Sequence, residues 1–263
     1  MLEVLRFMDY YGKKEYLSKE AAEEYDAIRF ATPQGQYVNT MDMHTVQKCV
    51  SIMKNRVIWL DLACGTGRFA ELALNYQYNV ICADISLEQL KLAVNRVSNR
   101  DGQLYPIRCD AESLPFKNGV FDCVSAMRFT GLLPRANLRR MLAEISWTTR
   151  EWAIIDVHNT LSLNIFWIWL QKFKKEPQKT YCISPRQLRR EIKTVGLRII
   201  KRYNNRFVAP ENLPPQMLPF VKAINYIALR SFLGYFSMQY VVLLQKIDLG
   251  PVIGCFPMPW FFK

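Results

Sequence analysis

The chain has 263 residues, of which half are hydrophobic and 22% are charged, a composition that excludes a disordered chain or a fibre and suffices for a buried core. Lys and Arg outnumber Asp and Glu by 35 to 23, which gives a formal net charge of +12. No apolar run reaches the roughly 18 to 20 residues of a membrane-spanning helix, and residues 1–17 lack the apolar core of a secretory signal. We therefore expect a cytoplasmic protein.

Short apolar runs alternate with helical segments from residue 57 onward, which is typical of a parallel sheet covered by helices. The apolar runs predict strands at 57–63, 78–83, 103–109, 121–127, 152–157, 197–203 and 238–245. Helices are predicted at 68–75, 87–97, 138–146 and 185–194. We divide the chain into a mainly helical lead-in and cap (1–50), a domain (51–247) with insertions at 160–177 and 210–234, and a tail (248–263) too rich in proline for a regular element.

The seven cysteines contain no CxxC pair and have no histidine at metal-ligand spacing. Several of them lie in apolar strand-like runs, where a free thiol behaves as a small hydrophobic side chain. We therefore expect a reduced protein without a structural zinc ion.

The loop after the first predicted strand is the most informative feature. Gly65 and Gly67 let the backbone turn sharply and let a ligand approach closely. Asp61 precedes this loop, where its carboxylate would repel a pyrophosphate, which disfavours a nicotinamide-dependent oxidoreductase. Asp84 and Asp110 follow the second and third strands. Acids at three successive strand ends suit a ligand with a cationic amino-acid part, a ribose diol and an adenine edge, such as S-adenosylmethionine.

Four segments in order resemble the motifs of class I S-adenosylmethionine-dependent methyltransferases. They are 60–70, 82–90, 109–116 and 119–124, and the upstream residues Tyr25–Asp26, Arg29–Phe30, Thr32–Gly35 and Asp42 are similar to the lead-in of the small-molecule branch, as in the methyltransferase type 11 domain family. The resemblance implies an α/β fold with a Rossmann-like, seven-stranded, mostly parallel sheet, helices on both faces and the last strand antiparallel. It also implies S-adenosylmethionine as the cofactor.

The resemblance assigns the methionine part of the cofactor to the first motif. The backbone of Ala63, Gly65 and Gly67 would wrap around this part, and Asp61 would lie near its ammonium group.

The ribose and adenine parts are assigned to the next two motifs. Asp84 would accept hydrogen bonds from both ribose hydroxyls, as an acid does in dinucleotide folds, and Ile85 would pack on the adenine. Asp110 would accept from the adenine amino group, and Ala111 would supply a backbone amide. Two structural alternatives stay open: Asp84 could cap the helix that starts at Leu87, and Asp110 could be a turn residue.

Methyl transfer from a sulfonium needs little acid–base help, so a single polar group could suffice on the acceptor side. His158 follows the fifth strand at the carboxyl edge of the sheet, and we predict that it is a base or a substrate hydrogen-bonding group. A loop histidine with only a structural role is the alternative, and His44 has less claim. No carboxylate of ligand type follows the fourth strand, which predicts metal-independent chemistry.

The segment after the fourth strand resembles a family pattern of Arg, apolar residues, His and Pro. Arg128 fits it and is a candidate substrate residue, but Thr130 and Gly131 stand where the family often has histidine. A histidine base at that point is excluded, which leaves a non-catalytic S-adenosylmethionine-binding protein as one alternative. The Asn/Asp-Pro-Pro-aromatic motif of amino-methylating nucleic-acid enzymes is missing there too.

The first ten residues of the segment 161–175 are mostly apolar and aromatic, and the last residues are basic. They could form a lid whose Phe166, Trp167 and Trp169 line the acceptor pocket, an interfacial helix on an anionic membrane, or core. Segment 171–206 contains twelve bases and two acids, which would suit a phosphate track in an RNA methyltransferase or a solvated surface. We predict a methyltransferase for a small-molecule or lipid-like acceptor, peripheral to the inner face of the membrane if the segment binds lipid, with nucleic acid as the less favoured partner.

Overall fold

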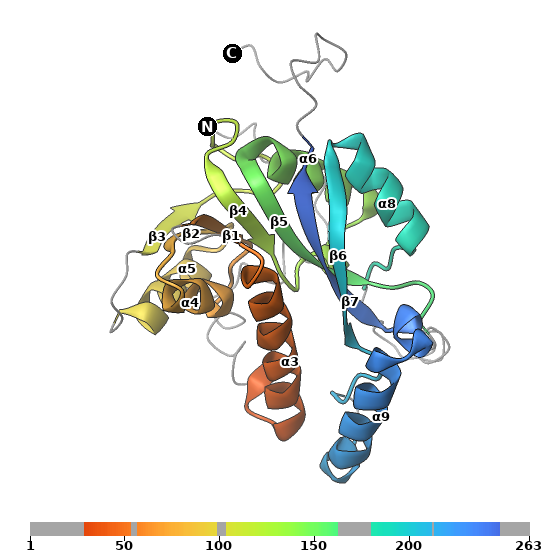
Figure 1. The fold of residues 1–263 in the computed structure, drawn as a ribbon. Helices are drawn as coiled ribbons and strands as arrows, with labels where there is room; N and C mark the ends of the chain where they lie inside the picture. The colour runs from red at the N-terminus through yellow and green to blue at the C-terminus, as the bar shows by residue number, and fades with distance from the viewer. Residues whose placement is uncertain (1–28, 54–56, 99–103, 163–179, 212, 248–263) are drawn as a thin grey trace.

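A seven-stranded sheet with the strand order β3-β2-β1-β4-β5-β7-β6 forms the centre of the computed structural model, which describes residues 29–53, 57–98, 104–162, 180–211 and 213–247 (Figure 1). The strands are β1 Ile58–Leu62, β2 Asn79–Asp84, β3 Leu104–Arg108, β4 Phe121–Ala126, β5 Thr149–His158, β6 Leu197–Arg206 and β7 Gln239–Lys246. The pairs among β1 to β5 are parallel, and β7 runs antiparallel to β5 and β6. The predicted sheet, with its last strand antiparallel, is confirmed.

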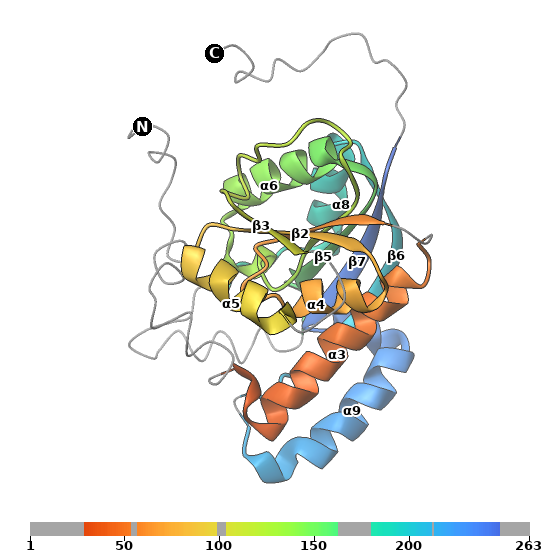
Figure 2. The same ribbon diagram turned by 90° about the vertical axis from the view of Figure 1, so that its left-hand side faces the viewer.

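Helices cover both faces of this sheet (Figure 2). They are α3 Pro33–Val50, α4 Arg68–Asn75, α5 Leu87–Val97, α6 Arg135–Thr148, α8 Pro185–Thr194 and α9 Leu218–Arg230, with short 3-10 helices η1 Thr130–Leu132, η2 Pro215–Met217 and η3 Phe232–Phe236. One apolar core joins α3, α4 and α5 to the sheet, and a second joins α6 and α8 to the other face. No helix in the described part of the chain is long and apolar enough to cross a bilayer.

Two helices differ from their sequence-based predictions. Helix α6 begins at Arg135, three residues before the predicted start. The prediction missed these three residues because the first turn is mainly polar and shows no apolar periodicity. Helix α9 lies in the segment 210–234, where no regular element was predicted. Its inner positions, such as Val221 and Ala228, are buried, but its outer positions are also apolar, so no polar face reveals the helical period.

Parts of the predicted architecture lie outside the described residues. These are residues 1–28, the segment 163–179 and the tail 248–263. The predicted lid residues Phe166, Trp167 and Trp169 fall within them, so their roles and the domain boundaries stay predictions. Within the lead-in, α3 begins with Thr32 as its N-cap and Pro33 as its first residue, a combination that favours a helix start.

Candidate active site

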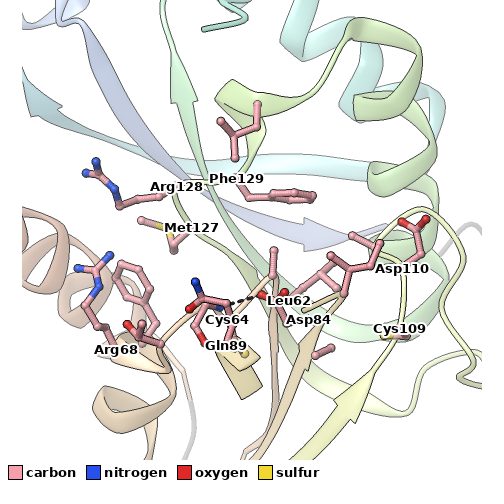
Figure 3. A pocket seen from close by; sticks show the side chains of 18 residues that line it. Leu62, Cys64, Arg68, Asp84, Gln89, Cys109, Asp110, Met127, Arg128 and Phe129 are labelled. Atoms are coloured by element: carbon pink, nitrogen blue, oxygen red, sulfur yellow. Dashed lines mark hydrogen bonds between the residues drawn. The ribbon is translucent and has the colours of Figure 1, made fainter. Parts of the chain in front are cut away.

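A cavity of about 880 Å³, open to solvent, lies at the carboxyl ends of β1, β2, β3 and β4 (Figure 3). In open α/β sheets, ligands bind at this edge because the loops between strands and helices meet there. The predicted residues Ala63, Gly65, Asp84, Ile85, Asp110, Ala111 and Arg128 all line the cavity. The structure therefore brings together seven positions that were selected from separate motifs.

The loop between β1 and α4 forms one wall of the cavity. Ala63, Gly65 and Gly67 have φ angles of 53°, 54° and 77°, in the left-handed region. Gly65 lines the cavity, and its contact with a cofactor stays a prediction. Gly67 does not line the cavity; it caps α4, and a Cβ there would lie 2.7 Å from the Cβ of Ala93 in α5. A glycine is needed at position 67 because α4 packs closely on α5 there and because the φ angle is positive.

Asp84 ends β2 and connects two motifs. Its Oδ2 accepts a hydrogen bond of 2.9 Å from the N–H of Gly65, and its Oδ1 accepts one of 2.9 Å from the N–H of Ser86. Burial raises the pKa of this carboxyl, while the backbone amides of Ser86, Gly65 and Ile85 oppose that shift. The N-cap of α5 is Ser86, whose hydroxyl accepts from Gln89, so the alternative that Asp84 caps this helix is wrong.

Asp110 lies beyond β3 on the far side of the cavity. Its Oδ1 accepts a hydrogen bond of 3.0 Å from the N–H of Glu112, and its carbonyl accepts one of 3.0 Å from the N–H of Ser113. It is therefore a turn residue and a cavity residue at once, and the two interpretations from sequence do not exclude each other. Ala111 is buried next to it.

Asp61, like Gly67, is a predicted cofactor residue that does not line the cavity. Its side chain is buried, with 1% of the residue exposed, and its Oδ1 accepts a 2.8 Å hydrogen bond from the hydroxyl of Ser125. The indole N–H of Trp59 donates to the same hydroxyl at 2.8 Å, which fixes its orientation. Burial raises the pKa of Asp61 to about 7. A contact between this carboxyl and an ammonium group stays a prediction.

Two further residues that line the cavity lie in the first turns of helices and were not predicted from the sequence motifs. Arg68 opens α4; its guanidinium lies 3.9 Å from the ring centroid of Phe30 and donates to Asn39 of α3. Gln89 lies in the first turn of α5 and is buried in the cavity wall. The position of both residues just after a motif strand was the signal that could have found them, because the first turn of each helix faces the same sheet edge.

Arg128 lines the cavity from the loop after β4, with a φ angle of 60°. Its N–H donates to Asp156 Oδ1 at 2.7 Å, and its guanidinium donates to Asp42 Oδ2 of α3 at 3.0 Å. Asn205 donates to the other oxygen of Asp42 at 2.6 Å. Although burial alone would raise the pKa of Asp42, the guanidinium groups of Arg206 and Arg128 help to hold it below its usual value. This buried ion pair ties α3 to the loop after β4.

The carboxyl of Asp156 supports the same loop from β5. Its Oδ2 accepts a 2.5 Å hydrogen bond from the side-chain amide of Gln239, and its backbone carbonyl accepts one of 2.5 Å from the hydroxyl of Thr130. Burial raises the pKa of Asp156 to about 6, with the negative charge of Asp42 acting in the same direction. Two buried acids thus position the backbone and the side chain of Arg128.

His158 lies at the end of β5, where it lines a second cavity of about 510 Å³ and not the cavity described above. A Cβ at Gly131 would lie 2.6 Å from Cδ2 of His158. The imidazole therefore occupies space that any side chain at position 131 would need, which explains the glycine there. Burial lowers the pKa of His158 to about 3, so the ring is neutral at physiological pH.

The comparisons with known proteins agree with this geometry. A family model described as a methyltransferase domain matches residues 60–151. The chain contains a class I S-adenosylmethionine-dependent methyltransferase domain. A ubiquinone/menaquinone biosynthesis C-methyltransferase of Edwardsiella ictaluri is 39% identical over 72 residues, which are 25% of this chain and 28% of that relative. The sequence match thus spans about a quarter of the curated relative.

Solved structures of methyltransferases share the fold over most of the chain. A methyltransferase of Thermotoga maritima, described as a possible histamine N-methyltransferase, is 17% identical, with 88% of this chain and 98% of that chain covered and a TM-score of 0.61. Magnesium protoporphyrin IX methyltransferase of Synechocystis PCC 6803 with bound S-adenosylhomocysteine is 13% identical, with 89% and 98% covered and a TM-score of 0.65. At these identities, the similarity establishes the fold.

The polar groups of the methyltransferase domain fit S-adenosylmethionine. A carboxylate offers about four lone-pair sites, and each oxygen of Asp84 accepts one hydrogen bond from the backbone amides of Gly65 and Ser86, which leaves lone pairs that can accept from a ribose diol. Gly65 presents backbone without a Cβ, and the opposite wall is apolar, with Met127, Phe129 and Leu132. In the described part of the chain, no three His, Cys, Asp or Glu side chains are placed to hold a metal ion.

In the described part of the basic segment, 180–206, six bases are exposed, whereas Arg202 is half-buried and Arg206 is buried; the exposed ones are Arg186, Arg189, Arg190, Lys193, Arg198 and Lys201. Arg206 is buried, with 1% of the residue exposed, and donates to Glu211 at 2.8 Å, so its predicted place on a basic surface is wrong. The guanidinium of Arg202 lies 3.9 Å from the ring centroid of Tyr240, and that of Arg198 donates to Gln245. Lys172, Lys174, Lys175 and Lys179 lie outside the described residues.

Proposed function

We propose that this chain transfers the methyl group of S-adenosylmethionine to a small-molecule or lipid-like acceptor. The observation that carries the proposal is the position of Asp84, at the end of β2 and inside a cavity formed by four strand ends, with its carboxylate held by two backbone amides. The match of residues 60–151 to the methyltransferase domain family supports the same chemistry.

The protein's contribution to this reaction is to hold and shield the reactants. The cofactor supplies a methyl group that is already activated by a sulfonium, so the chain needs to bind, orient and exclude water. Asp84 would hold the ribose and Asp110 the adenine amino group, while Met127 and Phe129 form the dry wall toward the acceptor. Arg128, held by Asp156 and Asp42, would contact the acceptor.

The acceptor class follows from the acceptor side of the cavity and not from the relatives. The names of these relatives refer to histamine, magnesium protoporphyrin IX and quinone biosynthesis, which indicate no common acceptor. Apolar Met127, Phe129 and Leu132 next to the guanidinium of Arg128 suit an apolar acceptor, and an anionic group on it would pair with the guanidinium. The RNA methyltransferase and the non-catalytic binding protein are the alternatives that the experiment below separates.

Release of S-adenosylhomocysteine, measured with a panel of apolar amines, phenols and carboxylates and with bulk RNA, tests this proposal. We expect turnover with an apolar acceptor and none with RNA. A chelator such as EDTA is expected to leave the rate unchanged, because the proposed chemistry needs no Lewis acid. Loss of activity with EDTA that magnesium restores would contradict the metal-independent reaction, and product release with RNA alone would favour the alternative enzyme.

We propose that His158 does not act as a base with a pKa near neutrality, because it lines the second cavity and not the one that contains the candidate cofactor residues. With its pKa lowered to about 3, the ring should stay neutral from pH 8 down to about pH 4 and gain a proton only below that. Ring signals in an NMR pH titration report this directly. The chain has one other histidine, the exposed His44, so a His44→Gln variant assigns the two signals. A His158 signal that titrates between pH 5 and 7 would contradict the burial of the ring.

A further inference from the structure

Helix α9 has two apolar faces, and only one of them is covered by the protein. The inner face is buried through Leu218, Val221, Asn225 and Ala228. On the outer face, Phe220, Ile224 and Ile227 are 63%, 46% and 66% exposed. Their spacing of four and three residues places them on one side of the helix. We call these three residues the outer face of α9.

The outer face of α9 belongs to a projecting part of the molecule. Helix α9 stands beside α3 below the sheet, where Asn225 donates to the hydroxyl of Tyr37, and the short helix η3 follows it directly (Figures 1 and 2). In η3, Phe232 is 80% exposed, and Tyr226 at the end of α9 is also exposed. Single exposed apolar residues are ordinary on protein surfaces, but a cluster on one helix indicates an interaction surface.

The exposed charges on α3 and α9 all have one sign, and the carboxylate of Glu211, in the loop before α9, pairs with Arg206 at 2.8 Å. Residues 213–247 contain Lys222, Arg230 and Lys246 and no Asp or Glu. The neighbouring helix α3 has one acid, Asp42, which is fully buried in its ion pair. Helices α3 and α9 therefore expose bases and no carboxylate. An apolar helix face beside exposed bases suits a surface of anionic lipid headgroups, because acyl chains receive the apolar side chains and phosphates attract the bases.

We propose that the outer face of α9 docks on an anionic membrane surface. The position of α9 determines how the cofactor cavity would face a bound membrane. The helix is inserted between the end of β6 and the start of β7, at the sheet edge that also holds the cofactor cavity. Docking would turn the cavity toward the lipid, in which an apolar acceptor dissolves. This orientation matters only if the proposed function holds. The docking itself does not depend on the cofactor.

Co-sedimentation of the full chain with lipid vesicles tests the proposal. Vesicles of phosphatidylcholine and phosphatidylglycerol in equal parts are compared with vesicles of phosphatidylcholine alone, at about 0.1 M and about 1 M salt, where the Debye length is about 10 Å and about 3 Å. The test variant is the double substitution Phe220→Gln and Ile227→Gln. Val94→Gln, an exposed apolar residue of α5, is the matched control. A second variant, Lys222→Gln with Arg230→Gln, removes the charges alone.

We expect binding to the anionic vesicles, at least tenfold weaker binding to the neutral ones, and weaker binding at high salt. The outer-face variant should lose at least tenfold in affinity with an unchanged melting temperature, because its side chains are exposed, while the control should bind as the native chain does. The charge variant should lose affinity only at low salt.

Other outcomes would overturn the docking proposal. Equal sedimentation of the native chain and the outer-face variant would place the lipid contact elsewhere. A native dimer in sedimentation velocity that the outer-face variant converts to a monomer would show that a second copy covers the face. A fall in the melting temperature of the outer-face variant would show that the chain itself covers it. None of these results would bear on methyl transfer, which the release of S-adenosylhomocysteine tests separately.

Discussion

Substitution of Asp84 by Ala is expected to weaken the binding of S-adenosylmethionine by a factor of roughly 10² to 10⁴. The carboxylate would make two charge-assisted hydrogen bonds to the ribose, each worth about 1.5 to 3 kcal/mol, and every 1.4 kcal/mol corresponds to a factor of about ten. The same substitution removes the acceptor of the Gly65 and Ser86 amides, so the loop loses its support as well. Isothermal titration calorimetry measures the affinity.

Asp122 provides a matched control for this substitution. Its carboxylate also accepts a backbone hydrogen bond, at 2.9 Å from the N–H of Ile58, and it pairs with Arg150, but it lies at the opposite edge of the sheet. Asp122→Ala should lower the melting temperature and leave the affinity for S-adenosylmethionine within about twofold of the native value. If the Asp84→Ala variant and the native chain bind S-adenosylmethionine with equal affinity, Asp84 does not bind the ribose.

Substitution of Gly67 by Ala is expected to lower the free energy of unfolding by about 2 to 5 kcal/mol. Overpacking of a tight contact costs about 1 to 3 kcal/mol, and the left-handed φ of 77° adds about 1 to 2 kcal/mol for a residue with a Cβ. The new Cβ would lie 2.7 Å from the Cβ and 2.9 Å from the Cα of Ala93, so α4 and α5 would have to separate. Urea unfolding followed by circular dichroism measures the change.

Gly119→Ala separates the two causes of this loss. Gly119 has a similar φ angle of 63°, but a Cβ there meets no atom within 4 Å. We therefore expect only the conformational cost of about 1 to 2 kcal/mol for this control. If both variants lose the same stability, the contact between Gly67 and Ala93 contributes nothing, and the packing explanation for this glycine is wrong.

The cofactor side of the site could be predicted because its residues follow from local order in the chain. The central strands, such as β1 and β4, are short apolar runs buried on both faces, and each is followed by a loop whose first polar residues face the same sheet edge. Asp84 and Asp110 therefore line the same cavity, and their contacts with a cofactor stay predictions. Asp61 does not line it, because a side chain in a strand takes one of two faces, and the motif does not say which one.

The acceptor side could not be predicted because it depends on contacts between distant segments. Arg128 and Asp42 are 86 residues apart in sequence, and nothing in either segment signals the ion pair between them. The close packing of Gly131 against the ring of His158 also joins two distant segments, and neither segment signals it. Helix α9 was missed for another reason: both of its faces are apolar, so its sequence has no polar stripe from which a period can be read.

Calorimetric titration of the native chain with S-adenosylhomocysteine and with NAD tests the central claim most directly, because it requires no knowledge of the acceptor. The methyltransferase assignment predicts stoichiometric binding of S-adenosylhomocysteine, a rise in melting temperature that grows with ligand concentration, and no binding of NAD. Binding of NAD without binding of S-adenosylhomocysteine would contradict the assignment of the cavity and return the chain to the nicotinamide-dependent class that Asp61 disfavours.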